Sequence, residues 1–138
     1  HAELDYGGHN FTIKGPSVAK PEIPNVRYRF VRLGVGGRMA VGPGMVLGMT
    51  GGYRHVLSAG EIESPTYFPR LDAGALDARV WLEVEIASSL SLSFVGEVER
   101  YFFSMNPEVG DPRIAGGAAD LYRGGRLLLK YQLPRDLL

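Results

Sequence analysis

The sequence contains no cysteine, which excludes disulfides, zinc–thiolate sites, iron–sulfur clusters and cysteine nucleophiles together. A fold without these crosslinks must be stabilised by strand pairing and side-chain packing. The chain also lacks net charge, because 15 Lys and Arg residues balance 15 Asp and Glu residues. Without a basic excess, it is not expected to bind nucleic acid.

Long hydrophobic runs are absent as well. No segment approaches the ~18 to 20 consecutive apolar residues that a membrane helix requires. The first ten residues, HAELDYGGHN, have neither the basic nor the apolar region of a signal peptide. Any membrane residence would therefore depend on strands, and we expect the chain either to begin at a processed boundary or to be a piece of a longer protein.

Apolar and polar residues instead alternate with a period of two along most of the chain, as they do in β-strands. The clearest stretch has Leu76 and Val80 at even positions and Asp77 at an odd position. Such stretches predict about six antiparallel strands, near residues 2–14, 26–41, 45–57, 76–86, 90–102 and 119–133. The apolar residues change parity between Phe30 and Val31, which predicts a β-bulge.

The expected connections between these strands alternate in length. Long loops are predicted near residues 14–25, 58–75 and 104–118, and tight turns near 42–44 and 87–89. All short turns then lie at one end of the sheet, as in outer-membrane barrels, which have short periplasmic turns and longer external loops. The 138 residues are enough for one domain spanning 1–138.

Three features favour an apolar face that meets lipid. The alternating stretches are long for soluble strands, whose usual length is ~5 to 6 residues, and they match the ~9 to 11 of a tilted membrane strand. The polar face carries several glycines, which suggests a crowded interior. Its charges are grouped by sign from strand to strand, so that opposite charges could meet across a curled sheet. The predicted charge network of this interior consists of Arg32, Arg38, Arg54, Asp77, Arg79, Glu83, Glu85, Glu97, Glu99, Asp120, Arg126 and Lys130.

Other readings of the same residues point elsewhere. A soluble β-barrel or sandwich, binding an apolar ligand or a protein partner, would place the apolar face inward and its long loops at a binding rim. Two Glu pairs, 83 with 85 and 97 with 99, have the spacing of glycosidase carboxylates, although a charge ladder explains them better. His1 with His9 or His55 could form a copper site, but no metal-binding cluster supports it. We expect no cofactor and no enzymatic activity.

The segment from Tyr122 to Leu133 resembles the C-terminal β-signal of bacterial outer-membrane barrels. Arg123, Gly124, Leu127 and Leu129 occupy the polar, glycine and alternating hydrophobic positions of that signal. The resemblance implies an outer-membrane protein of a Gram-negative bacterium, inserted into the lipid bilayer by the barrel-assembly machinery.

The overall prediction is an all-β fold, an antiparallel up-and-down meander of about six long strands that forms all or part of a transmembrane-type β-barrel. A closed single-chain barrel of this kind has at least ~8 strands. Further strands, from another chain or from a missing N-terminal segment, are therefore expected to complete it. Its function would be structural or pore-forming.

Overall fold

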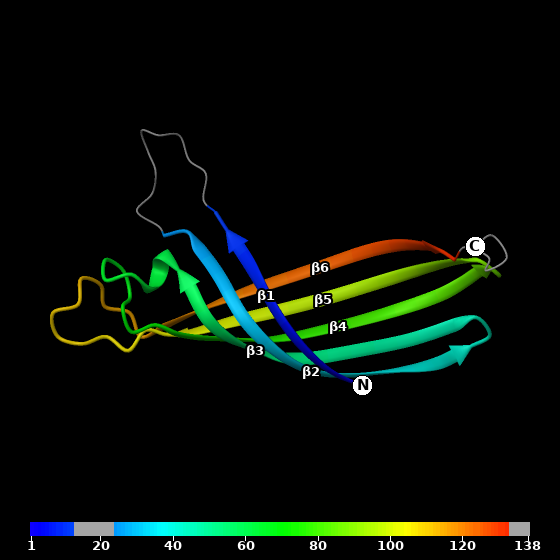
Figure 1. Cartoon of the computed structure of the whole chain (residues 1–138), viewed down its shortest axis with the longest axis horizontal. Helices are drawn as coiled ribbons and strands as arrows, with labels where there is room; N and C mark the ends of the chain where they lie inside the picture. Colours follow the sequence, from blue (N-terminus) through cyan, green and yellow to red (C-terminus); the bar gives the residue numbers. More distant parts are fainter. Residues whose placement is uncertain (13–23, 133–138) are drawn as a thin grey trace.

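The computed structural model describes residues 1–12 and 24–132. They form a single six-stranded antiparallel sheet in which the strands lie side by side in chain order (Figure 1). The elements are β1 (Ala2–Phe11), β2 (Val26–Gly42), β3 (Met45–Gly60), the 3-10 turn η1 (Glu61–Glu63), β4 (Asp72–Ala87), β5 (Leu90–Ser104) and β6 (Gly117–Tyr131). The predicted all-β, up-and-down meander is confirmed. Among the described residues, no helix is long and apolar enough to cross a membrane.

The connections alternate in length as predicted. The turns at 43–44 and 88–89 join long strands at one end of the sheet, and the longer loops at 61–71 and 105–116 lie at the other end (Figure 1). Gly44 adopts a φ of 65°, a conformation that favours glycine, which explains the tightness of the first turn. The loop predicted at 58–75 is shorter than expected because β3 continues to Gly60. Most of the loop predicted at 14–25 lies outside the described residues.

The sheet is strongly curved. The rings of Tyr28 on β2 and Tyr101 on β5 are stacked with centroids 4.2 Å apart. In a flat sheet these strands would be separated by three strand spacings, or roughly 14 Å. The sheet must therefore curl, and β1 passes in front of β4, β5 and β6 in Figure 1. It does not close, because no Cα atom of the described β1 lies within 8 Å of a Cα atom of β6.

Aromatic side chains fill the concave face near the loop end. The buried apolar residues there are Tyr28, Phe30, Val56, Ala59, Ala75, Tyr101, Phe103 and Met105. Tyr28 and Tyr101 are completely buried, and a stacked pair of this kind contributes ~0.5–1.5 kcal/mol beyond its buried area. The aromatic cluster therefore joins strands that are not neighbours in the sheet.

The same cluster explains the parity change seen in the sequence. The ladder between β2 and β3 does shift register between Arg29 and Phe30, next to the predicted bulge. Burial nevertheless alternates without interruption from Tyr28 to Gly34, so Phe30 and Arg32 face the same side. The change of parity marks the point where the concave face changes from aromatic to charged residues.

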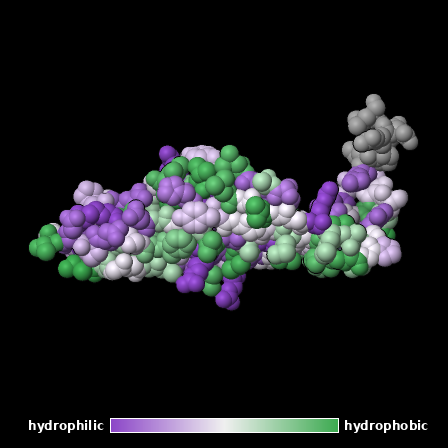
Figure 2. Space-filling view, turned by 90° about the horizontal axis from the view of Figure 1, so that it is seen from below, coloured by the Kyte–Doolittle hydropathy of each residue, from purple (hydrophilic) through white to green (hydrophobic). Residues whose placement is uncertain are grey.

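The convex face is apolar and exposed. Leu4, Val35 and Leu129 expose 73%, 69% and 68% of their surface, whereas Arg32 and Arg54 on the concave face are buried. Figure 2 shows hydrophobic residues over much of the strand region, with some hydrophilic residues among them, and hydrophilic residues gathered at the loop end. The sheet thus turns its polar side inward and its apolar side outward.

The two described loops are tied together at their end of the sheet. Arg70 in the first loop pairs with Asp111 and donates from Nε to the Asn106 carbonyl oxygen at 3.1 Å in the second loop. The Glu108 backbone N–H also donates to Asp111, at 2.7 Å. This N–H donor and the Arg70 guanidinium lower the pKa of the Asp111 carboxyl below its ordinary value.

The tie between the loops is expected to weaken in acid. Since the folded pKa of Asp111 is depressed, its contribution is complete above the unfolded pKa of ~3.9 and is lost as pH falls through the lower folded pKa. The measurement is a carboxyl-carbon NMR titration, in which Asp111 should titrate below the pH expected for a free Asp. In the Arg70→Gln variant, its midpoint should move upward. An unchanged midpoint would show that the Arg70 pair does not form.

The concave-face ion-pair network

Arg32 on β2 is the centre of a buried ion-pair network. Its Nε and Nη2 both donate at 2.8 Å to Asp77, which lies on β4, two strands away. Its Nη1 donates to Glu3 at 2.6 Å and to Asp5 at 3.1 Å on β1. The side chains of Arg32 and Asp77 are only 9% and 8% exposed. One guanidinium therefore holds three strands together across the concave face.

Arg54 on β3 extends the network toward the loop end. Its Nε donates to Asp77 at 3.0 Å, and its two Nη atoms donate to Glu99 on β5 at 2.6 and 2.8 Å. Nη1 also donates to the Tyr101 hydroxyl at 3.0 Å, and the guanidinium lies 4.6 Å from the Phe30 ring centroid. Asp77 thus bridges two arginines, and each buried charge has a partner, as burial in a low dielectric requires.

Glycines provide the space that Arg32 occupies. A Cβ atom at Gly52 would lie 2.8 Å from the Arg32 guanidinium carbon, and one at Gly34 would lie 2.5 Å from Arg32 Nη1. Both glycines face the concave side next to the arginine. The sequence prediction of a crowded interior, based on glycines of the polar face, agrees with these distances.

Gly48 likewise provides the space that the side chain of Trp81, the only tryptophan in the sequence, occupies. A Cβ atom at Gly48 would overlap the indole ring. We expect Gly48→Ala to displace the ring, to shift its fluorescence emission, and to cost ~1–3 kcal/mol through overpacking. Gly37→Ala is the matched control, because a Cβ there meets no described atom within 4 Å. Equal emission spectra for the two variants would contradict the packing described.

A second group of charges lies nearer the tight turns and is more exposed. Glu97 accepts from Arg126 at 2.6 Å and is 3.6 Å from the Nε of Arg79. Glu83 pairs with Lys130. The side chains of Arg79, Arg126 and Lys130 are about half exposed. Exposed pairs of this kind contribute little to stability, ~0–1 kcal/mol each.

Most of the twelve residues predicted for the network lie in these clusters. Asp120 accepts a hydrogen bond from the Tyr28 hydroxyl at 3.1 Å. Arg38 and Glu85 are exposed on the same face and have no ion pair among the described residues. Glu3 and Asp5 were not among the residues predicted for the network, although their alternation with Leu4 and Tyr6 is typical of a strand.

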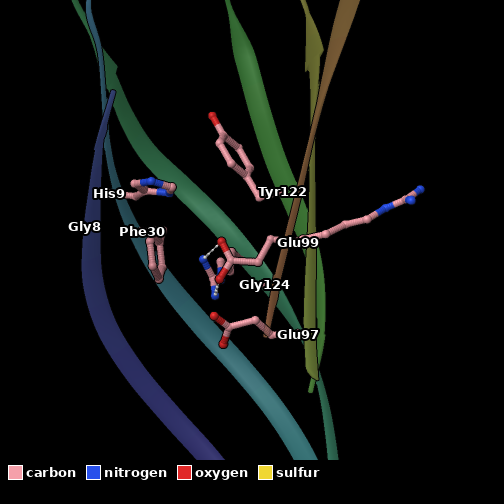
Figure 3. Close-up of a pocket in the computed structure, with 9 residues that line it drawn as sticks. Gly8, His9, Phe30, Glu97, Glu99, Tyr122 and Gly124 are labelled. Carbon is pink, nitrogen blue, oxygen red and sulfur yellow. Dashed lines mark hydrogen bonds and ion pairs between the residues drawn. The ribbon is translucent and has the colours of Figure 1, made fainter. Parts of the chain in front are cut away.

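The network lies beside a cavity where the sheet remains open. This cavity of 270 Å³ separates β1 from β5 and β6. In Figure 3, His9 and Phe30 lie on one side of it, and Tyr122, Glu99 and Glu97 lie on the other. The ring centroids of His9 and Tyr122 are 5.0 Å apart, so side chains narrow the opening that the backbone leaves.

The histidines considered for copper do not converge. His9 faces the concave side, His55 faces the convex side, and His1 bonds to Glu3. Within residues 1–12 and 24–132, no group of three or more His, Asp or Glu side chains is placed to hold a metal ion.

Of the four glutamates considered for sugar hydrolysis, all but Glu85 have a basic partner among the described residues. Glu83 contacts Lys130, and Glu97 contacts Arg126. Glu99 contacts Arg54. These contacts are those of a charge ladder.

Comparisons with known proteins found no counterpart for this chain. No protein-family model matches it, and neither do the curated proteins or the solved structures.

Proposed function

We propose that the chain is part of an outer-membrane β-barrel with a structural role, whose interior is closed by ion pairs. The observation that carries this proposal is the orientation of the two faces. The apolar face is convex and exposed, while the charged face is concave and internally paired. A soluble barrel needs the opposite arrangement, and lipid is the solvent that suits an apolar exterior.

The height of the apolar face supports the proposal. On β4 the outward apolar residues extend from Leu76 to Ile86, which is roughly 33 Å at about 3.3 Å per residue. With the ~40° tilt of membrane-barrel strands, this length covers roughly 25 Å along the membrane normal, the usual height of the lipid-facing band.

Aromatic residues lie near both ends of this face. Tyr53 and Phe102 have ring centroids 6.3 Å apart and cover the backbone of Gly74 near the loop end. Tyr131 is exposed near the tight turns. Amphipathic rings at these levels suit the two membrane–water interfaces.

The interior favours a structural role over an open pore. Arg32, Arg54 and Asp77 occupy its middle, and the stacked Tyr28 and Tyr101 occupy the loop end. A diffusion pore keeps an interior wide enough for water, whereas a narrow barrel is filled by side chains. The paired charged side chains therefore fill the interior.

The proposed barrel needs further strands. Among the described residues, β6 pairs only with β5, and β1 begins opposite Val35, so the last part of β2 pairs only with β3. Unpaired edges are very costly in lipid. The closing strands would come from sequence outside these residues or from another chain. Insertion would use the barrel-assembly machinery, with β6 as the strand it recognises.

The competing function is a soluble module whose convex face is covered by protein. The test is extraction of the full chain from membranes. We expect the chain to need detergent to remain folded and monodisperse, with strand content followed by circular dichroism. A chain that is folded and monodisperse in aqueous buffer without detergent would refute the membrane proposal.

Conductance across a planar bilayer separates a structural barrel from a pore. The expected result is no sustained current from inserted protein, since side chains fill the concave side. A steady, reproducible conductance would instead support a pore-forming role for the same barrel.

A further inference from the structure

Two arginines on the convex face interrupt its apolar character. Arg100 on β5 and Arg123 on β6 are both exposed, and neither forms an ion pair or hydrogen bond among the described residues. Their neighbours on this face are apolar, including Leu76, Val98 and Leu121. A charge on a lipid-facing strand costs from ~0–1 kcal/mol near an interface to ~2–4 kcal/mol at the bilayer midplane, and a bound anion would offset this cost.

The two side chains are placed to share one anion. Arg100 pairs with Leu121 and Val98 pairs with Arg123, so the arginines are diagonal neighbours on the same face. Diagonal neighbours have Cα atoms about 7–8 Å apart, within reach of long side chains. Because both are cationic, their proximity is unfavourable unless an anion lies between them. A phosphate can accept hydrogen bonds from both guanidinium groups.

A strip of bare backbone begins directly beside Arg123. Gly96 and Gly125 are opposite each other in the ladder, and a Cβ at Gly96 would meet no described atom within 4 Å. The next residues on this face are Phe94 and Leu127, both exposed. The strip offers an apolar floor for a hydrocarbon chain that continues from an anion held by the arginines.

The depth of the arginines also suits a lipid headgroup. Each second residue along a tilted strand descends roughly 5 Å. Arg100 and Arg123 therefore lie about 5 and 10 Å below the level of Phe102, near the loop end of the band. Arginine side chains extend toward the interface from such positions. Their charges can thus reach the phosphate level while the glycine strip lies among the acyl chains.

We propose that Arg100, Arg123 and the strip formed by Gly96 and Gly125 bind a lipid with an anionic phosphate headgroup. The phosphate lies between the two guanidinium groups, and an acyl chain lies across the glycines. This inference rests on the proposed membrane location. It commits to a lipid because both a charged pair and an adjoining apolar strip are present, whereas a free phosphate would use only the arginines.

The test measures binding to the full chain in dodecyl maltoside micelles by native mass spectrometry. The probes are dihexanoyl phosphatidic acid, dihexanoyl phosphatidylcholine and inorganic phosphate. Wild-type protein should bind phosphatidic acid at least about tenfold more tightly than either other probe, as expected from charge-assisted hydrogen bonds. The Arg100→Gln/Arg123→Gln variant should lose this preference. Gly96→Val should weaken phosphatidic acid binding and leave phosphate binding unchanged.

The matched control is Arg27→Gln/Arg29→Gln, which removes the same charge from exposed residues at the loop end of β2. It should retain the preference. The proposal is overturned if this control loses as much phosphatidic acid binding, or if inorganic phosphate binds as tightly as the lipid. It is also overturned if the main effect of Arg100→Gln/Arg123→Gln is to abolish self-association, because the two arginines would then bind a second copy of the chain. Circular dichroism in micelles establishes that each variant is folded. A chain that proves folded and monodisperse without detergent fails the membrane proposal itself, independently of these binding results.

Discussion

Replacing Asp77 with asparagine is expected to lower the free energy of unfolding by about 3–5 kcal/mol, the usual cost of removing one partner from a buried ion pair. Asp77 accepts hydrogen bonds from Arg32 and Arg54, and its side chain is 8% exposed. The variant would leave two guanidinium groups with less compensation on the concave face. Unfolding by urea in micelles, followed by the fluorescence of Trp81, measures this loss.

Glu85→Gln is the matched control for this experiment. Glu85 lies on the same strand and face as Asp77, but it is exposed and has no ion pair within the described ranges. Its replacement should change stability by less than ~0.5 kcal/mol. A double-mutant cycle between Asp77→Asn and Arg32→Gln should show coupling of ~0.5–3 kcal/mol. Similar losses for Asp77→Asn and Glu85→Gln would contradict a buried network.

Placing arginine on the convex face should have an effect that depends on depth. Val80 lies near the middle of the apolar band and Ile86 lies near the tight turns, and they are 48% and 58% exposed. In a bilayer, Val80→Arg should cost ~2–4 kcal/mol and Ile86→Arg only ~0–1 kcal/mol. Unfolding by guanidinium chloride from lipid vesicles measures the two costs, because this denaturant leaves the vesicles intact.

The two variants carry the same new side chain on the same strand and face, so each serves as the control for the other. If water covers the convex face, both substitutions should be close to neutral. If another protein layer covers it, both should be strongly destabilising because each buries an unpaired charge. Only the difference between the two positions supports lipid.

Strand positions and turns were predictable from the sequence because a period of two is a local property. Leu76 to Ile86 alternate so regularly that no tertiary information is needed. The tight turns followed from Gly44 and from the serines at 88–89, where the alternation breaks. Loop boundaries were less accurate, since β3 and β4 continue beyond the clearest alternation.

The contacts on the concave face could be predicted only as a set of charges. Arg32 and Asp77 meet across an intervening strand, so their pairing depends on sheet curvature, which no local pattern specifies. The aromatic cluster was missed for another reason. Tyr28 and Phe30 are aromatic residues at positions that face the polar, concave side. From alternation alone, they look like a shift of the strand by one residue.

The hydrogen bond between Tyr28 and Asp120 links residues 92 positions apart in the chain. The β2–β3 and β4–β5 hairpins involve neighbouring sequence and can form early, whereas this bond requires the last strand. Contacts of high sequence separation slow folding, because the loop between them must be closed before they contribute. We therefore expect hairpins to pair first and the interior to become ordered last, when β6 arrives. Formation of the contacts on the concave face would then mark the last step of folding.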